Sequence, residues 1–230
     1  MKFYYDLHIH SDLSPCSSRD MTPNNIINMS LIKELDIIAV TDHNSAENLR
    51  AVTEVGKKTG IKVIPGLEVT TREEVHVLCY FKELDKAEEF GRAIYDSLPP
   101  VKNNPEIFGE QNIYNSKDEI RAVLDKLLIN ACKYTIEDIY SMVKEYNGVM
   151  IPAHINKMTN GILGVLGFMP LNLKIDFVEV YPKLPIDHKI TEKYKVLKNS
   201  DAHQLIDISE AVNYFELNNV DDVYSFLKLQ

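Results

Sequence analysis

Histidine and carboxylate residues recur at similar places along this chain. Six of its seven histidines fall at or just after short apolar stretches, in "DLHIHS", "VTDHNS", "EEVHVLCYF", "IPAHIN" and "NSDAH". The histidines are His8, His10, His43, His76, His154 and His203. Two acidic residues, Glu68 and Asp201, stand in the same kind of position. A single histidine near a strand end is more often a hydrogen-bonded structural residue, but six at equivalent positions are improbable as independent accidents. Because imidazole and carboxylate ligands suit zinc, manganese or iron, the pattern predicts a metal site.

The first of these stretches has the spacing of a strand that presents ligands on one face. If Phe3–Ile9 is a strand, Asp6, His8 and His10 share one side, and Leu7 and Ile9 share the other. Two ring nitrogens on one side can then converge on one ion. We expect Asp6, one step deeper, to accept the second N–H of a histidine and so fix its tautomer.

Other chemically capable residues allow more than one interpretation. Asp12 fits a ligand or a turn aspartate, and Asp42 fits a ligand, a support for a ligand or a cap. His188 is expected at the surface. Cys79 and Cys132 are expected to be small buried apolar residues.

Strands and helices must alternate to bring these residues together. Strand-length apolar runs occur at 3–9, 36–41, 61–64, 75–81, 148–152, 175–180 and 196–199, with a further edge strand at 212–217. Helices are predicted over 22–36, capped by Thr22 and Pro23, and over 135–148, capped by Thr135 and ended by Gly148. This order favours a parallel sheet covered by helices, either a barrel or an open sheet. Both place chemistry at the carboxyl ends of strands.

One segment breaks this alternation. Residues 97–134 contain several prolines and asparagines before the helix-like "EIRAVLDKLLINA". A long irregular segment in a compact domain is typically a functional cover or a packed surface loop. We expect residues 1–230 to form one domain in which 97–134 is an insertion or lid over the site.

The composition sets limits on partners and location. The net charge of −9 argues against binding to long nucleic acids, which usually requires a basic surface. The hydrophobic fraction of 45% and charged fraction of 26% are typical of a soluble globular protein. We predict no membrane segment or leader and, from three widely spaced cysteines, a cytoplasmic location.

The motifs "DLHIHS", "AVTDHN", "PAH" and "NSDAH", with "GLEVT" followed by a histidine, resemble those of the PHP family, the polymerase and histidinol phosphatase domains. This resemblance implies a distorted seven-stranded (β/α)7 barrel, similar to a TIM barrel, with three metal ions at the carboxyl ends of its strands. It assigns one ion to His8, His10, Glu68 and Asp201, a second to Glu68, His76 and His154, and a third to His43 and His203. Another ligand of the third ion is usually a His or Asp, and the matching position here holds Cys16.

The predicted activity is hydrolysis of a phosphate ester by water activated on two or three divalent metal ions. Asp201 or a metal-held histidine such as His203 would handle the proton. Lys157 is predicted to contact the substrate phosphate, although a solvated loop lysine is nearly as good an interpretation. Arg19 and Arg72 are weaker candidates for the same role.

Two alternatives remain open at this level. The site could cleave a phosphodiester, as an exonuclease acting on nucleotides or short oligonucleotides, instead of a small-molecule phosphomonoester. A metal-stabilised module without catalysis is the least favoured hypothesis, because all but one of the expected ligand positions hold the residue type that the resemblance implies. Neither the phosphorylated substrate nor the oligomeric state follows from the sequence.

Overall fold

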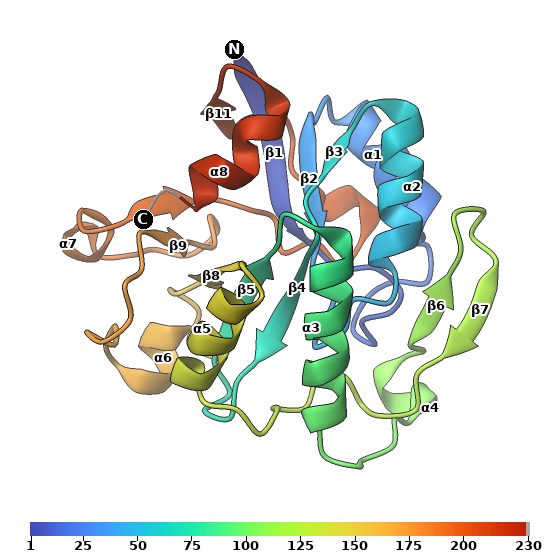
Figure 1. Ribbon diagram of the computed structural model, residues 1–230, viewed down its shortest axis with the longest axis horizontal. Helices are drawn as coiled ribbons and strands as arrows, with labels where there is room; N and C mark the ends of the chain where they lie inside the picture. Colours follow the sequence, from blue (N-terminus) through green and yellow to red (C-terminus); the bar gives the residue numbers. More distant parts are fainter. Residues whose placement is uncertain (229–230) are drawn as a thin grey trace.

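The structure is a computed structural model that describes residues 1–228. Its strands are β1 (Lys2–Ile9), β2 (Ile37–Val40), β3 (Lys62–Val63), β4 (Gly66–Thr70), β5 (His76–Tyr80), β6 (Asn112–Tyr114), β7 (Ile120–Val123), β8 (Val149–Pro152), β9 (Phe177–Glu179), β10 (Lys195–Leu197) and β11 (Tyr214–Glu216). Its α-helices are α1 (Pro23–Ile32), α2 (Leu49–Thr59), α3 (Leu84–Ser97), α4 (Pro105–Phe108), α5 (Ile136–Glu145), α6 (Ile162–Leu166), α7 (His188–Thr191) and α8 (Val223–Leu227). Strands β1, β2, β4 and β5 run through the middle of the molecule, and α1, α2, α3 and α5 lie around them (Figure 1).

Within residues 1–228 the strands form four small sheets. One has the order β11-β1-β2-β3, and in it β1, β2 and β3 are parallel while β11 is antiparallel. A second, β4-β5-β8, is antiparallel throughout. Strands β9 and β10 form a parallel pair, and β6 and β7 an antiparallel one. Single bridges, such as those from Ile9 to Ala202 and from His43 to Glu68, connect the ends of separate sheets.

The predicted seven-stranded (β/α)7 barrel is therefore wrong for this structure. None of the sheets in residues 1–228 closes on itself, and the parallel arrangement is broken by antiparallel pairs. The physical reason lies in the link from β4 to β5, a tight turn in which the Thr71 N–H donates to the Val75 carbonyl at 2.9 Å. Parallel neighbours need a long crossover, so a turn this short permits only an antiparallel pair.

Both predicted helices are present and begin as predicted, but each ends earlier: α1 ends at Ile32, and α5 ends at Glu145, before Gly148. In α1 the Thr22 hydroxyl accepts from the Asn25 N–H, and Pro23 opens the helix. In α5 Thr135 and Asp138 form a reciprocal capping box. At the start of each helix, the capping side chain thus accepts from a backbone N–H that has no partner within the helix.

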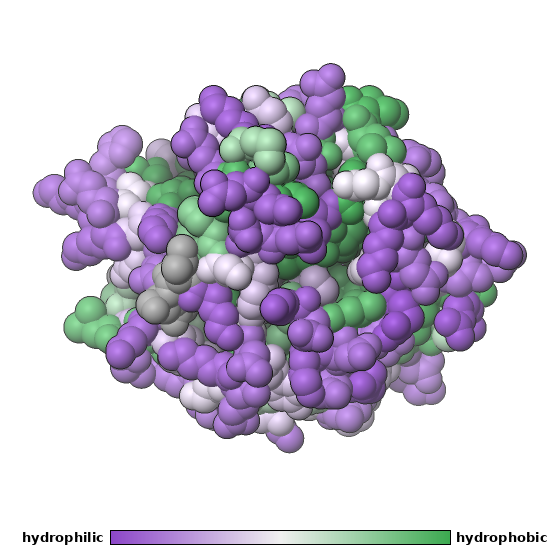
Figure 2. All heavy atoms as spheres, turned by 45° about the horizontal axis from the view of Figure 1, so that its top comes forward, coloured by the Kyte–Doolittle hydropathy of each residue, from purple (hydrophilic) through white to green (hydrophobic). Residues whose placement is uncertain are grey.

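Apolar side chains gather in three clusters that fix the sheets against each other and against the helices. The inner cluster includes Leu7, Tyr80, Ile151 and Phe177, from four different strands. The other two lie beneath α1 and α2 and beneath α3 and α5. Hydrophilic side chains predominate on the face drawn in Figure 2, with apolar groups between them. No helix within residues 1–228 has the length and apolar character to cross a membrane.

Strand β1 does not alternate strictly as predicted. The register between β1 and β2 shifts between Asp6 and Ile9. Leu7 consequently packs in the inner cluster, whereas Ile9 packs beneath α1 and α2. Bulges of this kind redirect side chains next to functional sites.

The segment 97–134 holds a hairpin where the sequence indicated a helix. Residues of "EIRAVLDKLLINA" form β7, which pairs with β6, and the hairpin extends to one side of the molecule (Figure 1). Buried Asp12 anchors the hairpin by accepting from the Asn112 amide at 2.8 Å and the Tyr114 hydroxyl at 2.5 Å. Asp12 thus ties the segment to the loop that follows β1.

Candidate metal centre

The residues predicted to bind metal converge at one end of the sheets. His8 and His10 come from the end of β1, His43 from the loop after β2, and Glu68 from β4. His154 follows β8, and Asp201 and His203 follow β10. His76 stands at the start of β5, which runs opposite to β4 and β8 and so begins where they end. The cluster therefore draws on every sheet except the β6–β7 hairpin.

Glu68 lies at the centre of this cluster and is fully buried. Five imidazoles approach its two carboxylate oxygens within 3.5 Å. The nitrogens are His76 Nδ1 at 2.9 Å, His43 Nδ1 at 3.0 Å, His154 Nε2 at 3.1 Å, His8 Nε2 at 3.3 Å and His10 Nε2 at 3.5 Å. One carboxylate thus contacts ligand candidates from four different strands.

A second convergence surrounds Asp201. Its Oδ1 lies 3.3 Å from His8 Nε2 and 3.3 Å from His10 Nε2, and these two nitrogens are 3.1 Å apart. His8, His10 and Asp201 form one of three triads in the described residues whose ligand atoms could hold an ion. The others are His43, Glu68 and His76, and His10, His43 and His203.

Glu179 performs the role that the sequence assigned to Asp6. Both carboxylate oxygens of Glu179 lie 3.0 Å from His8 Nδ1, and the same side chain accepts from the His154 backbone N–H at 2.7 Å. Asp6 instead accepts from the backbone N–H groups of Ser200 and Ser209, so it holds the loop that carries Asp201. The shifted register of β1 explains why the predicted pairing of Asp6 with a histidine ring is wrong.

Electrostatics favour the metal-binding protonation state at Glu68 and His10 but not at every ligand candidate. Burial raises the pKa of the Glu68 carboxyl, but the imidazoles of His76 and His8 outweigh burial and hold that pKa well below its usual range. Burial and the nearby His203 imidazole hold the pKa of His10 well below its usual value. An ionised carboxylate and a neutral imidazole are the forms that coordinate a cation. Burial lowers the pKa of His8 and of His43, but nearby carboxylates outweigh burial and raise the pKa of His8 well above its usual value and that of His43 to about 10.

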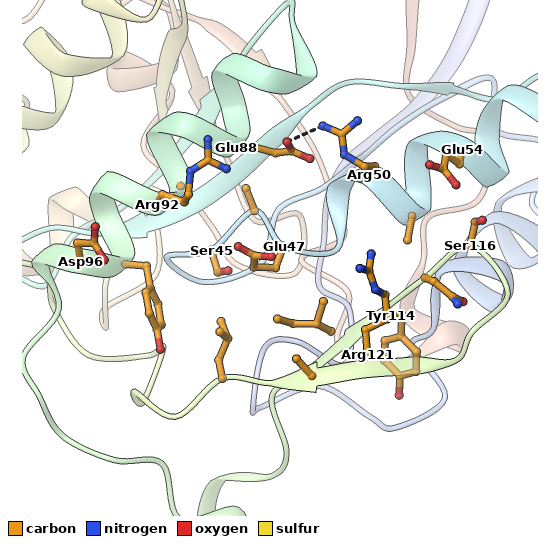
Figure 3. Close-up of a pocket in the computed structure, with 18 residues that line it drawn as sticks. Ser45, Glu47, Arg50, Glu54, Glu88, Arg92, Asp96, Tyr114, Ser116 and Arg121 are labelled. Atoms are coloured by element: carbon orange, nitrogen blue, oxygen red, sulfur yellow. Dashed lines mark hydrogen bonds and ion pairs between the residues drawn. The ribbon is translucent and has the colours of Figure 1, made fainter.

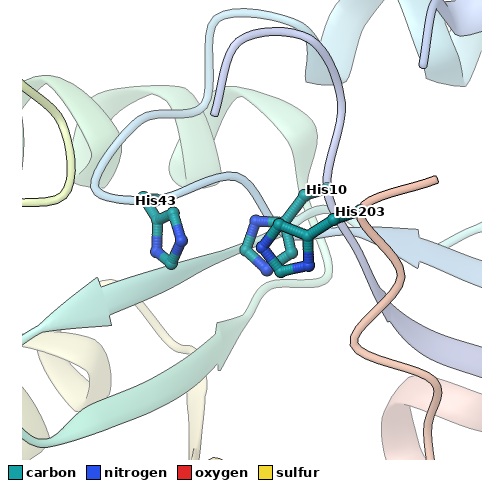
Figure 4. Close-up of side chains that lie close together, drawn as sticks. All are labelled: His10, His43 and His203. Atoms are coloured by element: carbon teal, nitrogen blue, oxygen red, sulfur yellow. The ribbon is translucent and has the colours of Figure 1, made fainter. Parts of the chain in front are cut away.

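A third convergence lies nearer the surface. The rings of His10 and His203 are stacked with centroids 4.3 Å apart, and the His43 ring lies 4.5 Å from that of His10 (Figure 4). Cys16 is exposed, and its thiol lies beside His203 and His43. Desolvation raises the pKa of this thiol, but hydrogen bonding with those imidazoles outweighs it and lowers the pKa to about 6.

Among the predicted cations, Lys157 adjoins the cluster. Its ammonium forms an ion pair with Asp201 and lies 4.4 Å from the centroid of the Tyr181 ring. Arg19 and Arg72 are exposed, so the structure gives them no buried contact with the ligand candidates. His188 is exposed on α7, away from the other histidines.

The backbone is strained at three residues of the site. His154, Asp201 and Asn44 adopt positive φ angles of 27°, 54° and 50°. Such angles are uncommon for residues other than glycine and tend to occur at functional sites. Here they coincide with the loops that present the candidate ligands.

A separate cleft of about 490 Å³ lies between α2, α3 and the β6–β7 hairpin (Figure 3). Its walls carry both signs of charge, and Arg50 pairs there with Glu88 at 2.6 Å. None of the clustered histidines lines this cleft. The cleft and the metal centre are therefore distinct features.

Two supporting residues were missed by reasoning from the sequence. Glu179 had a signal, because it is an acidic residue inside the apolar stretch 175–180. Ser14, whose hydroxyl contacts Asp42, His43 and His10, had no such signal, because a serine in a loop does not stand out by residue type.

Comparison with known proteins agrees with the motifs. A family model described as the PHP domain matches residues 6–195. The chain belongs to the PHP domain family. The predicted resemblance is thus confirmed, and the structure adds Asp201 and His203, which lie beyond the matched range but contact the cluster.

Individual relatives are more distant. A phosphoribosyl 1,2-cyclic phosphate 1,2-diphosphodiesterase from Eggerthella lenta is 30% identical over 78 residues, which cover 32% of this chain and 29% of that protein. A lesion-specific endonuclease from Pyrococcus furiosus superposes with a TM-score of 0.68 at 22% identity, over 98% of this chain and 56% of that one. A protein from Bifidobacterium adolescentis assigned as a metal-dependent phosphoesterase has a TM-score of 0.61 at 14% identity, over 97% and 95% of the two chains. This chain therefore spans little more than half of the endonuclease and under a third of the diphosphodiesterase.

Proposed function

We propose that this chain is a metal-dependent hydrolase that cleaves phosphate esters with two or three divalent ions, such as zinc, manganese or iron. Membership of the PHP domain family and the three ligand triads support the proposal. The proposed ligands are His8, His10, His43, Glu68, His76, His154, Asp201 and His203, with Cys16 as a further ligand beside His43 and His203.

One observation carries this proposal: the carboxylates of Glu68 and Asp201 and the ring nitrogens of five histidines converge within 3.5 Å in a buried space. Both oxygens of Glu179 lie 3.0 Å from His8 Nδ1, and His8 Nε2 lies 3.3 Å from the carboxylates of Glu68 and Asp201. Glu68 Oε2 and His43 Nδ1 lie 3.0 Å apart, yet both are buried and neither has a hydrogen-bond partner. Buried polar atoms normally have partners, so this arrangement suits cations between them.

The chain's own groups have separate roles in the proposed reaction. Bound divalent ions supply a water of lowered pKa and positive charge for the phosphoryl oxygens. The Lys157 ammonium, now paired with Asp201, stands at the edge of the cluster where it can bind a substrate phosphate. Asp201 or His203 would take the proton of the attacking water, because both reach the cluster and remain partly open to solvent.

The favoured substrate is a small-molecule phosphomonoester. The net charge of −9 supports this choice over long nucleic acids, because the chain lacks a strongly basic composition. A phosphodiester is the second candidate, since the relative from Eggerthella lenta is named as a diphosphodiesterase and the one from Pyrococcus furiosus as an endonuclease.

We further propose that residues 1–230 act as one cytoplasmic domain in which 97–134 covers one side of the site. Two contacts join this segment to the loop after β1: the hydrogen bonds of Asp12 and a close approach at Gly109. Gly109 has a φ of +95°, and a Cβ there would lie 2.3 Å from the Pro15 carbonyl oxygen. This close approach to Pro15, the neighbour of Cys16 in the chain, supports the proposal.

The experiment combines elemental analysis of purified protein with phosphate release from paired substrates. We expect two or three divalent ions per chain and faster release from a phosphomonoester than from a phosphodiester tested with the same metal. Natively folded protein without bound metal would refute the metal centre. Bound metal with no hydrolysis of any phosphate ester would instead support a structural metal site.

A further inference from the structure

Ser14 links two of the candidate ligand loops through one buried hydroxyl. This oxygen lies 2.7 Å from Asp42 Oδ1, 3.1 Å from the His43 backbone nitrogen and 3.1 Å from His10 Nδ1. Ser14 and His10 are fully buried, and Asp42 and His43 nearly so. These polar atoms therefore cannot hydrogen-bond to solvent and depend on one another as partners.

Counting protons determines the direction of each bond. A serine hydroxyl has one proton and two lone pairs. Asp42 Oδ1 also accepts from the Ser11 backbone N–H at 2.7 Å, and Oδ2 accepts from the Ser11 hydroxyl at 2.6 Å, as expected of an ionised carboxylate. The Ser14 proton is therefore used on Asp42, and its lone pairs accept from the His43 N–H and from His10.

We propose that Ser14 and Asp42 are positioning residues that fix His10 with its proton on Nδ1 and hold His43 beside it. His10 Nε2 then presents its lone pair to the cluster, next to His43 and His203, and these three residues form one of the triads that could hold an ion. This inference rests on the proposed metal centre. It assigns His10 a support different from that of His8, whose Nδ1 is held by Glu179 directly.

The two supports predict separable effects. Loss of Ser14 removes the acceptor of His10 Nδ1 and of the His43 backbone N–H but leaves the pair of His8 and Glu179 untouched. Partners of this kind typically change metal affinity by about 10–100-fold. The affinity of one ion should therefore fall by that factor, while at least one other ion stays bound.

The test compares Ser14→Ala with Ser11→Ala. Ser11 is the matched control because its hydroxyl also donates to Asp42 but contacts neither histidine ring. Long-range 1H–15N NMR of metal-free protein at pH 8 reports which ring nitrogen of His10 carries the proton. We expect protonated Nδ1 in the wild-type and Ser11→Ala proteins and a mixture of tautomers in Ser14→Ala.

Calorimetric titration with zinc then measures each binding step. Ser14→Ala should weaken one step about 10–100-fold, and Ser11→Ala should weaken none by that amount. A proton on Nε2 of wild-type His10, or a Ser14→Ala protein with unchanged tautomer and affinities, would overturn the assignment. Wild-type protein that binds no zinc would refute the metal centre itself, whereas the tautomer measurement judges the hydrogen-bond assignment without metal.

Discussion

Replacing Glu68 by glutamine tests the centre of the proposed site most directly. The change keeps the shape of the side chain but removes its charge and turns one acceptor oxygen into a donor. Both oxygens of Glu68 lie within 3.5 Å of imidazole nitrogens from five histidines. A neutral amide there would no longer offset the charge of bound cations, so ion binding should be lost first at the proposed sites that include Glu68.

The size of the effect follows from the linkage between binding and folding. An ion at 100 times its Kd stabilises the folded state by about 2.7 kcal/mol if it does not bind the unfolded chain. For a chain of 230 residues, 1 kcal/mol corresponds to about 2–4 °C in Tm, which gives a gain of about 5–11 °C per tightly bound ion. Glu68→Gln should lose most of this gain, because the variant is expected to lose binding of the ions whose sites include Glu68.

The assay is thermal unfolding of metal-free protein with and without added zinc or manganese. His188→Ala is the matched control, since His188 is exposed on α7 and lies outside the cluster. We expect the wild-type and His188→Ala proteins to gain several degrees and Glu68→Gln to gain close to none. An equal gain in all three proteins would show that metal binds elsewhere and would refute the reasoning.

Three further predictions follow from individual contacts. Glu179→Gln should weaken metal binding about 10–100-fold in calorimetry, because it removes the carboxylate that orients His8; unchanged affinity would contradict that role. Lys157→Gln should lower kcat/KM for a phosphate ester about 10–150-fold, the value of a charge-assisted hydrogen bond of about 1.5–3 kcal/mol, with metal content unchanged. Because the pKa of the Cys16 thiol is about 6, it is mostly thiolate at pH 7 and should react with iodoacetamide well before the two buried cysteines. Mass spectrometry measures this labelling, and protection of Cys16 by zinc would support its role as a ligand.

Much of the candidate site could be predicted because residue type and position after a strand carry the signal. His8, His10, His43 and Glu68 were selected in this way, and the structure brings them into one buried cluster. The supporting contacts could not be predicted, because they depend on tertiary placement. Glu179 reaches the cluster from a strand 171 residues after His8, and no local spacing indicates such a pair.

The segment 97–134 shows where local propensity fails. "EIRAVLDKLLINA" is rich in good helix formers, but tertiary contacts override this weak preference. The Gln111 side-chain amide donates to the carbonyls of Leu124 and Lys126 at 2.8 Å, and its carbonyl oxygen accepts from the Leu128 N–H at 2.9 Å. These bonds hold the chain after β7 in an extended path that a helix would not allow.

The mixed sheet explains why His76 belongs to the site although it breaks the rule used to find the others. In a parallel barrel a residue at the start of a strand lies at the end opposite the chemistry. Strand β5, however, runs antiparallel to both neighbours, so its first residue pairs with Thr70 at the end of β4. His76 thereby reaches Glu68 at 2.9 Å, and the antiparallel pairing that rules out the predicted barrel also completes the ligand cluster. The histidine pattern thus depends on strand ends meeting at one place, not on all strands pointing the same way.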